Sequence, residues 1–220
     1  MGEAVNEDST WVDARLKLPY SLIVSGSSQS GKSTFVKNLL LNSGRLFDTQ
    51  LQYVVVFSGS QDETFKSIST DFPITFVEGL PSDFDLYIKS DKVGLFIIDD
   101  LETKVSVNQD VLHLFTTKCH HCNVSVILIM QNLYSPGNER IGMLRNATYL
   151  CVFRSPLDQS IVWNVARRIN PSKTKLVMRV ISSILERYRY VFITGHPRSP
   201  SSIRFRTDLF NPLYQRCFIL

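Results

Sequence analysis

Residues 26 to 34 of the chain read Gly26-Ser27-Ser28-Gln29-Ser30-Gly31-Lys32-Ser33-Thr34. They satisfy the pattern G-x-x-x-x-G-K-[ST], and they stand between the apolar run Leu22–Val24 and an apolar segment of helical type. Strand, glycine loop and helix in this order are typical of a phosphate-binding loop, because glycine lets backbone N–H groups close around phosphate oxygens. We therefore predict that all nine residues bind a nucleoside triphosphate. Lys32 is expected to reach the β- and γ-phosphates and to be catalytic, and Ser33 to ligate Mg²⁺.

A second motif supplies carboxylates. The apolar run Leu95–Ile98 ends in Asp99-Asp100. Paired acids at the carboxyl end of a buried strand are typical of a Walker B element, since two buried like charges are costly without a cation. We predict that Asp99 holds the Mg²⁺ shell and that Asp100 polarises the attacking water. Glu102 is the competing base.

A polar amide follows a third apolar run. Val124–Met130 is followed by Gln131-Asn132. An amide in that place can sense the γ-phosphate or position water, and we predict Gln131 as catalytic. The alternative, an amide that caps the following loop, is equally consistent with the spacing.

The apolar runs alternate with helical patterns, which predicts the fold class. The predicted strands are Tyr20–Val24, Tyr53–Phe57, Leu95–Ile98, Val124–Met130, Tyr149–Phe153 and Tyr190–Thr194, and the predicted helices are Lys32–Leu41, Asn108–Lys118, Asp158–Ile169 and Ser172–Arg187. Several runs are apolar at every position, as in strands buried on both faces of a parallel sheet. We predict an α/β fold, a P-loop NTPase three-layer sandwich with a mainly parallel central sheet.

The order of these motifs resembles a known superfamily. After the loop and the paired acids, His120-His121-Cys122-Asn123-Val124-Ser125-Val126 leads into a strand that ends in Gln131-Asn132-Leu133. This order resembles the FtsK/HerA superfamily, and within it the genome-packaging ATPases of double-stranded DNA viruses of poxvirus, polinton, adintovirus and virophage type. The resemblance continues through Arg140–Asn146 to the terminal IRFRTDLF and covers about Leu18 to Phe210.

The resemblance implies a RecA/FtsK-like ATPase that uses ATP and Mg²⁺ to move double-stranded DNA into a capsid. Members work as homo-oligomeric rings, hexamers or pentamers, and an arginine finger from the neighbour completes each site. By position Arg140 matches that finger, and Arg145 and Arg154 are rivals. Viral capsid components are the implied partners. The implied location is the nucleus or the cytoplasm of the infected host cell, and association with the virion is a further possibility of the resemblance.

Charge divides the chain into unequal halves. Residues 1–110 hold 9 Lys+Arg and 16 Asp+Glu, whereas residues 111–220 hold 15 and 4, so a net charge of +4 conceals halves of −7 and +11. The basic half suggests a polyanion partner, although ion pairs or an acidic neighbour would give the same count. Candidate DNA contacts are Arg167 and Arg168 on a predicted helix, and Arg204 and Arg206, which a period of two places on one face. A solvated face is the alternative for each.

Length and composition limit the remaining possibilities. The chain has 220 residues, 44% of them hydrophobic and 20% charged, which fits one domain at residues 18–220 preceded by a flexible acidic arm at residues 1–17. No apolar run is long enough for a membrane span. The cluster Cys119-His120-His121-Cys122 is interpreted as a packed helix end more readily than as a zinc site, since no second ligand pair exists at zinc-finger spacing. Alternative functions are a nucleotide or small-molecule kinase and a non-hydrolysing assembly protein.

Overall fold

A computed structural model describes residues 13–59, 63–68, 70–105, 108–134, 138–155, 160–197 and 199–219. Within these residues one sheet of nine strands has the order β3-β2-β4-β5-β1-β6-β7-β8-β9. The strands are β1 Ser21–Ser25, β2 Tyr53–Ser58, β3 Ile74–Glu78, β4 Gly94–Asp99, β5 Val124–Met130, β6 Tyr149–Phe153, β7 Tyr190–Thr194, β8 Phe205–Thr207 and β9 Arg216–Phe218. The six strands from β3 to β6 are mutually parallel, and the pairs from β6 to β9 are antiparallel.

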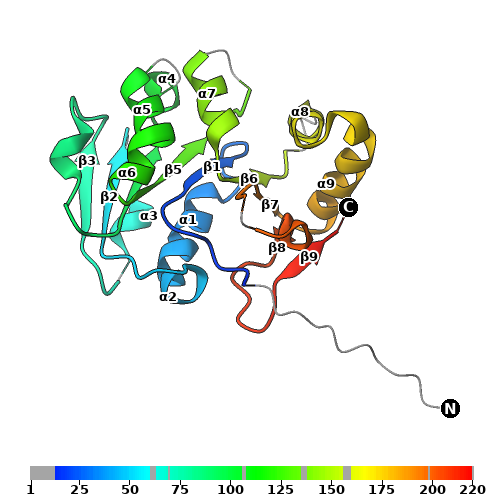
Figure 1. Ribbon diagram of the computed structural model, residues 1–220, viewed down its shortest axis with the longest axis horizontal. Helices are drawn as coiled ribbons and strands as arrows, with labels where there is room; N and C mark the ends of the chain where they lie inside the picture. The colour runs from blue at the N-terminus through cyan, green and yellow to red at the C-terminus, as the bar shows by residue number, and fades with distance from the viewer. Residues whose placement is uncertain are drawn as a thin grey trace.

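Helices cover both faces of the sheet (Figure 1). The helices are α1 Lys32–Leu41, α2 Ser43–Leu46, α3 Glu63–Lys66, α4 Glu102–Val105, α5 Gln109–His113, α6 Cys119–His121, α7 Asn138–Asn146, α8 Ser160–Ile169 and α9 Thr174–Arg187, with the short turns η1 Phe84–Tyr87, η2 Leu114–Lys118, η3 Pro171–Lys173 and η4 Ser201–Ile203. One core joins the sheet to α5, α7, α8 and α9, and the other joins it to α1, α2 and α3. The predicted three-layer α/β sandwich with a mainly parallel sheet is confirmed.

The central strands are buried because their apolar side chains face both cores. Every residue of β1, β4 and β5 is buried. Alternate residues contribute to opposite faces, so that Ile23 packs with one core while Leu22 and Val24 pack with the other. This two-sided burial is the physical reason for the continuous apolar runs in the sequence.

Some predicted boundaries differ from the observed ones. The predicted helix Asn108–Lys118 consists of α5 and the π-helical turn η2, and it continues beyond Lys118 as α6. The strands β3, β8 and β9, which lie at the ends of the sheet, had no predicted counterpart. β3 has only exposed and half-buried residues, and β8 and β9 have three residues each, so none carries the long apolar run of a central strand.

The chain packs against the sheet earlier than the expected domain start at Leu18. Leu16 is 1% exposed, its N–H donates to the carbonyl oxygen of Leu46, and it pairs with Phe47. Residues 13–17 therefore belong to the packed structure, whereas residues 1–12 of the expected arm lie outside the described residues. Within the described part of the chain, no helix has the length and apolarity to cross a bilayer.

Candidate nucleotide-binding site

The glycine loop connects the buried strand β1 to helix α1 at the carboxyl edge of the sheet. A methyl carbon at Gly26 would lie 2.5 Å from the Cβ atom of Phe153, at the end of the neighbouring strand β6. Gly31 has φ +100°, a backbone conformation that side chains rarely adopt. Glycine is thus required at both ends of the loop, once for space and once for conformation.

The side chains of Lys32 and Ser33 lie at the positions where the phosphates and the metal ion are expected to bind. Lys32 is 8% exposed, and its Nζ donates to the carbonyl oxygens of Gly26 and Ser27, both at 2.8 Å. The Oγ of Ser33 donates to Oδ2 of Asp99 at 2.9 Å. The structure therefore brings the serine of the loop and the first acid of the predicted Walker B pair into direct contact.

The paired acids end strand β4, which is separated from β1 by β5. Asp99 is 7% exposed, whereas Asp100 is exposed and has φ +56°. A non-glycine residue in this region stores backbone strain, which the surrounding structure must maintain. Gly59 helps to hold this conformation, because its N–H donates to the carbonyl oxygen of Asp99. A side chain at position 59 would collide with the carbonyl oxygen of Asp100.

Gly59 is a residue that the sequence analysis missed. Its signal was a glycine directly after the apolar strand β2, in the stretch YVVVFSG. Glu102, the competing base, begins α4, but its side chain lies outside the described residues.

The oxygen atoms of Ser33 and Asp99 at the carboxyl edge of the sheet are suitable ligands for a magnesium ion. Mg²⁺ prefers oxygen ligands and is usually held by one or two protein side chains together with phosphate oxygens and water. Ser33 and the nearly buried Asp99 offer a hydroxyl and a carboxylate oxygen 2.9 Å apart. Among the described residues, no cluster of three or more His, Cys, Asp and Glu side chains offers a cage made by protein alone. Ser33 and Asp99 are thus the residues that would hold the ion.

Gln131 follows β5, between the loop and the acids. It is exposed, and Met130 immediately before it accepts a hydrogen bond from the N–H of Gly26. Asn132 has the capping role that was the alternative, because its Oδ1 accepts from the N–H of Tyr134 at 3.0 Å. Asn132 therefore caps the loop, whereas Gln131 is exposed at the end of β5, beside the strand that leads into the glycine loop.

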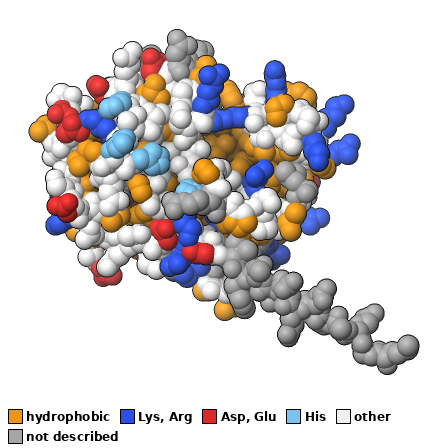
Figure 2. Space-filling view, in the orientation of Figure 1, with side chains coloured by type: hydrophobic (Ala, Val, Ile, Leu, Met, Phe, Trp, Pro, Cys, Tyr) orange, Lys and Arg blue, Asp and Glu red, His pale blue; other side chains and the backbone are white. Residues whose placement is uncertain are grey.

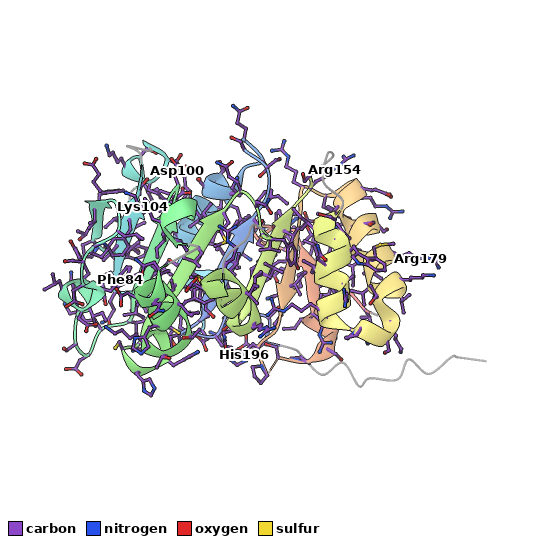
Figure 3. The ribbon with its side chains drawn as sticks, turned by 90° about the horizontal axis from the view of Figure 1, so that it is seen from above. Phe84, Asp100, Lys104, Arg154, Arg179 and His196 are labelled. Atoms are coloured by element: carbon purple, nitrogen blue, oxygen red, sulfur yellow. The ribbon has the colours of Figure 1, made fainter. Side chains whose placement is uncertain are left out.

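Arg140, the predicted arginine finger, is buried within its own chain. It lies on α7, is 2% exposed, and its Nη1 donates to the carbonyl oxygen of Asn132. Its position ties α7 to the loop after Gln131. The rivals are both exposed: Arg145 is in the last turn of α7, and Arg154 follows Phe153 at the edge that also holds Asp100 (Figure 3).

The four arginines predicted to contact DNA do not form one surface. Arg167, Arg168 and Arg204 are exposed. The prediction that Arg206 contacts DNA is wrong, because its side chain is 1% exposed. It donates to the carbonyl oxygen of Ala14 and to side-chain oxygens of Thr194 and Gln215. The chain turns through η4 before β8 begins, which breaks the period of two and directs Arg206 into the protein.

The cysteine and histidine cluster at the end of α6 is packed against the sheet. Cys119 is fully buried and its Sγ donates to the carbonyl oxygen of Phe115. Burial raises the pKa of the Cys119 thiol to about 11, which disfavours the thiolate that binds zinc. Cys122 is half-buried at the end of the helix.

Comparison with known proteins supports the fold. No protein-family model and no curated protein matches the sequence. Among solved structures, the genome packaging NTPase B204 from Sulfolobus turreted icosahedral virus 2 in complex with sulfate is similar with a TM-score of 0.55 and 14% identity, over 80% of this chain and 92% of that chain. The fold is that of a P-loop NTPase.

Two further P-loop NTPase structures agree with this assignment. The complex of the same B204 protein with ATP-gammaS has a TM-score of 0.51 and 13% identity, over 80% of this chain and 92% of that chain. The DNA-packaging ATPase B204 from Sulfolobus Turreted Icosahedral Virus has a TM-score of 0.51 and 13% identity, over 80% of this chain and 93% of that chain.

Proposed function

We propose that the chain is an ATPase that moves viral double-stranded DNA into a capsid, working as a homo-oligomeric ring with an arginine finger supplied in trans. The observation that carries the ATPase is the contact between Ser33 and Asp99, beside a loop that requires glycine at Gly26 and Gly31. The likeness to structures titled genome packaging NTPase and DNA-packaging ATPase supports the DNA-packaging role.

The residues of this chain would divide the work of phosphoryl transfer among them. Backbone N–H groups of the loop would bind the phosphates, and Lys32 would exchange the carbonyl oxygens of Gly26 and Ser27 for phosphate oxygens. Mg²⁺, when bound to Ser33 and Asp99, supplies charge neutralisation for the leaving phosphate. Asp100 would orient and polarise the attacking water, with Gln131 beside it.

The first experiment tests turnover and its dependence on DNA. We expect ATP hydrolysis that is stimulated by long duplex DNA and loses this stimulation as salt rises, because phosphate contacts release counterions. Lys32→Ala and Asp99→Ala should each lower turnover at least about 100-fold. Phosphate transfer to a nucleoside monophosphate would instead identify a kinase. A complete lack of turnover with DNA and capsid present would favour a non-hydrolysing assembly protein.

A mixing experiment tests the finger. Lys32→Ala subunits have no working site but still present a finger, whereas finger variants have a working site and no finger. We expect mixed rings of Lys32→Ala with the correct finger variant, Arg140→Ala, Arg145→Ala or Arg154→Ala, to regain turnover that each loses alone, by about 1000-fold for a finger. The matched control is Lys32→Ala with Asp99→Ala, which damage the same site and should not recover. Recovery with none of the three arginine variants would show that no finger acts in trans from these positions.

DNA contact is proposed for the exposed Arg168 and Arg204. Arginine contacts to phosphate do not read the base sequence, which suits a motor that must move along any genome. Arg167 instead lines a cleft between α8 and α9.

A further inference from the structure

Helices α8 and α9 leave an open cleft between them with an unusual lining. The cleft has a volume of about 660 Å³, and its lining residues, here called the basic cleft, are Trp163, Arg167, Pro171, Ser172, Lys173, Thr174, Lys175, Leu176 and Arg179. Four of the nine are Lys or Arg and none is acidic. No residue in the described part of the chain forms an ion pair with any of these four cations. The basic cleft therefore collects positive charge that the described residues do not compensate.

The basic cleft also exposes apolar surface. Trp163 is 43% exposed and Leu176 is 45% exposed. An aromatic residue and arginines around a hollow are typical of the energetic centre of a protein interface. A DNA duplex would be held by its phosphates and would leave the tryptophan without a role. These observations favour a protein partner with acidic and apolar side chains.

The opposite end of the sheet has the complementary chemistry. β3 is the outermost strand, and no described strand pairs with its free edge. Residues 71–93, which contain β3 and η1, carry five acidic residues and two lysines, whereas residues 160–189 carry one acidic residue and seven Lys or Arg. Phe76 is 43% exposed and Leu86 is 75% exposed. We call Phe76, Glu78, Asp83, Leu86 and Asp91 the acidic edge.

The two surfaces lie at opposite ends of the molecule. Phe84, the buried residue of η1, and Arg179 of the basic cleft are at opposite ends of the view in Figure 3. Lys and Arg side chains gather over α8 and α9 in Figure 2, while Asp and Glu are prominent toward the β3 end and low in the middle of the view. The acidic segment at residues 71–93 and the basic segment at residues 160–189 are thus separated in space.

We propose that the acidic edge of one copy of this chain docks into the basic cleft of the next copy. Complementary surfaces at opposite ends of a subunit produce head-to-tail contacts, which close into a ring or continue as a filament. The contact would place the three carboxylates of the acidic edge against the four cations of the basic cleft, and it would cover Trp163, Leu176 and the open edge of β3, a kind of edge that proteins normally protect. This inference deepens the proposed ring, and it assigns Arg167 to the subunit contact.

Charge reversal tests the contact by sedimentation and light scattering without nucleotide or DNA. Arg167→Glu/Lys175→Glu/Arg179→Glu leaves one lysine among three acids and so reverses the basic cleft, and Glu78→Lys/Asp83→Lys/Asp91→Lys reverses the acidic edge; all six side chains are exposed. Each triple variant alone should assemble at least about tenfold more weakly than the wild type, because like charges then meet. An equimolar mixture should assemble again, since every cleft then faces an edge of opposite charge. Wild-type assembly should weaken with salt.

The control reverses two exposed cations outside the cleft, Lys66→Glu/Arg187→Glu, and should assemble like the wild type. Thermal melting of each variant shows that it is folded. The proposal is overturned if the mixture does not recover, or if the cleft variant assembles normally. Normal assembly with lost duplex binding would assign the cleft to DNA. Wild-type chain that stays monomeric even with ATP and DNA would contradict the proposed ring as well, whereas loss of turnover in Lys32→Ala tests the ATPase independently.

Discussion

Arg204 and Arg206 stand two residues apart and have opposite surroundings. Arg204 is exposed at the end of η4, whereas the guanidinium of Arg206 lies over the ring of Phe192 and donates to three oxygen atoms of the protein. Strand alternation would place both on one side, but alternation holds only within a strand, and β8 begins after Arg204. A cation in a basic stretch is therefore not evidence of a DNA contact until its neighbours are known.

Substitution of Arg206 by alanine should affect mainly the stability of the fold, and substitution of Arg204 should affect mainly DNA binding. Arg206→Ala leaves buried oxygen acceptors without a donor and should lower the free energy of unfolding by about 1–3 kcal/mol. Arg204→Ala should leave it unchanged within about 0.5 kcal/mol and should weaken duplex binding and reduce its salt dependence. Urea denaturation and a salt series of duplex binding measure the two effects. Equal stability of the two variants would contradict the assignment.

At the scale of elements, tertiary contacts hold the N-terminal segment at residues 13–17 against the rest of the protein. Its only large apolar side chain is Leu16, so the sequence pattern indicated a polar arm. In the structure the carbonyl oxygen of Leu16 accepts from the N–H of Asp48, and its side chain enters the core that contains α1 and α2. The N–H of Lys17 donates to the phenol oxygen of Tyr149.

Shortening this side chain measures how firmly the segment is docked. Leu16→Ala should lower the free energy of unfolding by about 2–5 kcal/mol, as for other buried leucines. Leu213→Ala is the matched control, because Leu213 is 88% exposed and should contribute almost nothing. Urea denaturation of both variants gives the comparison. A Leu16→Ala variant as stable as the control would show that residues 13–17 are an arm after all.

At the scale of the whole molecule, the four cysteines report on how the layers pack. Cys119 and Cys151 are buried, Cys122 is half-buried and Cys217 is exposed. Burial raises the pKa of the Cys119 thiol to about 11 and raises the pKa of the Cys151 thiol well above its usual range. Only the thiolate is an effective nucleophile, so both buried groups stay protonated and unreactive near neutral pH.

Thiol titration of the native protein at pH 8 should therefore distinguish two pairs. Cys122 and Cys217 should be labelled by an aromatic disulfide reagent, whereas Cys119 and Cys151 should be labelled only after denaturation. Mass mapping of the labelled peptides identifies the positions, and Cys122→Ser/Cys217→Ser should leave almost no fast reaction. Fast labelling of Cys151 in the folded protein would mean that β6 is not enclosed by both layers.

The order of short motifs along the chain was sufficient to predict the fold class and the centre of the site. Gly26 to Thr34 and Asp99-Asp100 could be recognised because phosphate and metal binding need fixed residue types at short spacing, and because strands buried on two faces need unbroken apolar runs. Such signals are local, so the sequence carries them without reference to distant residues.

Only the tertiary structure decided what depends on distant neighbours. It buried Arg140 and Arg206, connected Ser33 to Asp99 across 66 positions of the chain, and separated Gln131 from the capping Asn132. It also placed the acidic segment at residues 71–93 and the basic segment at residues 160–189 at opposite ends of the molecule. Exposure and long-range contact are properties of the packed chain, and no periodicity within a short segment encodes them.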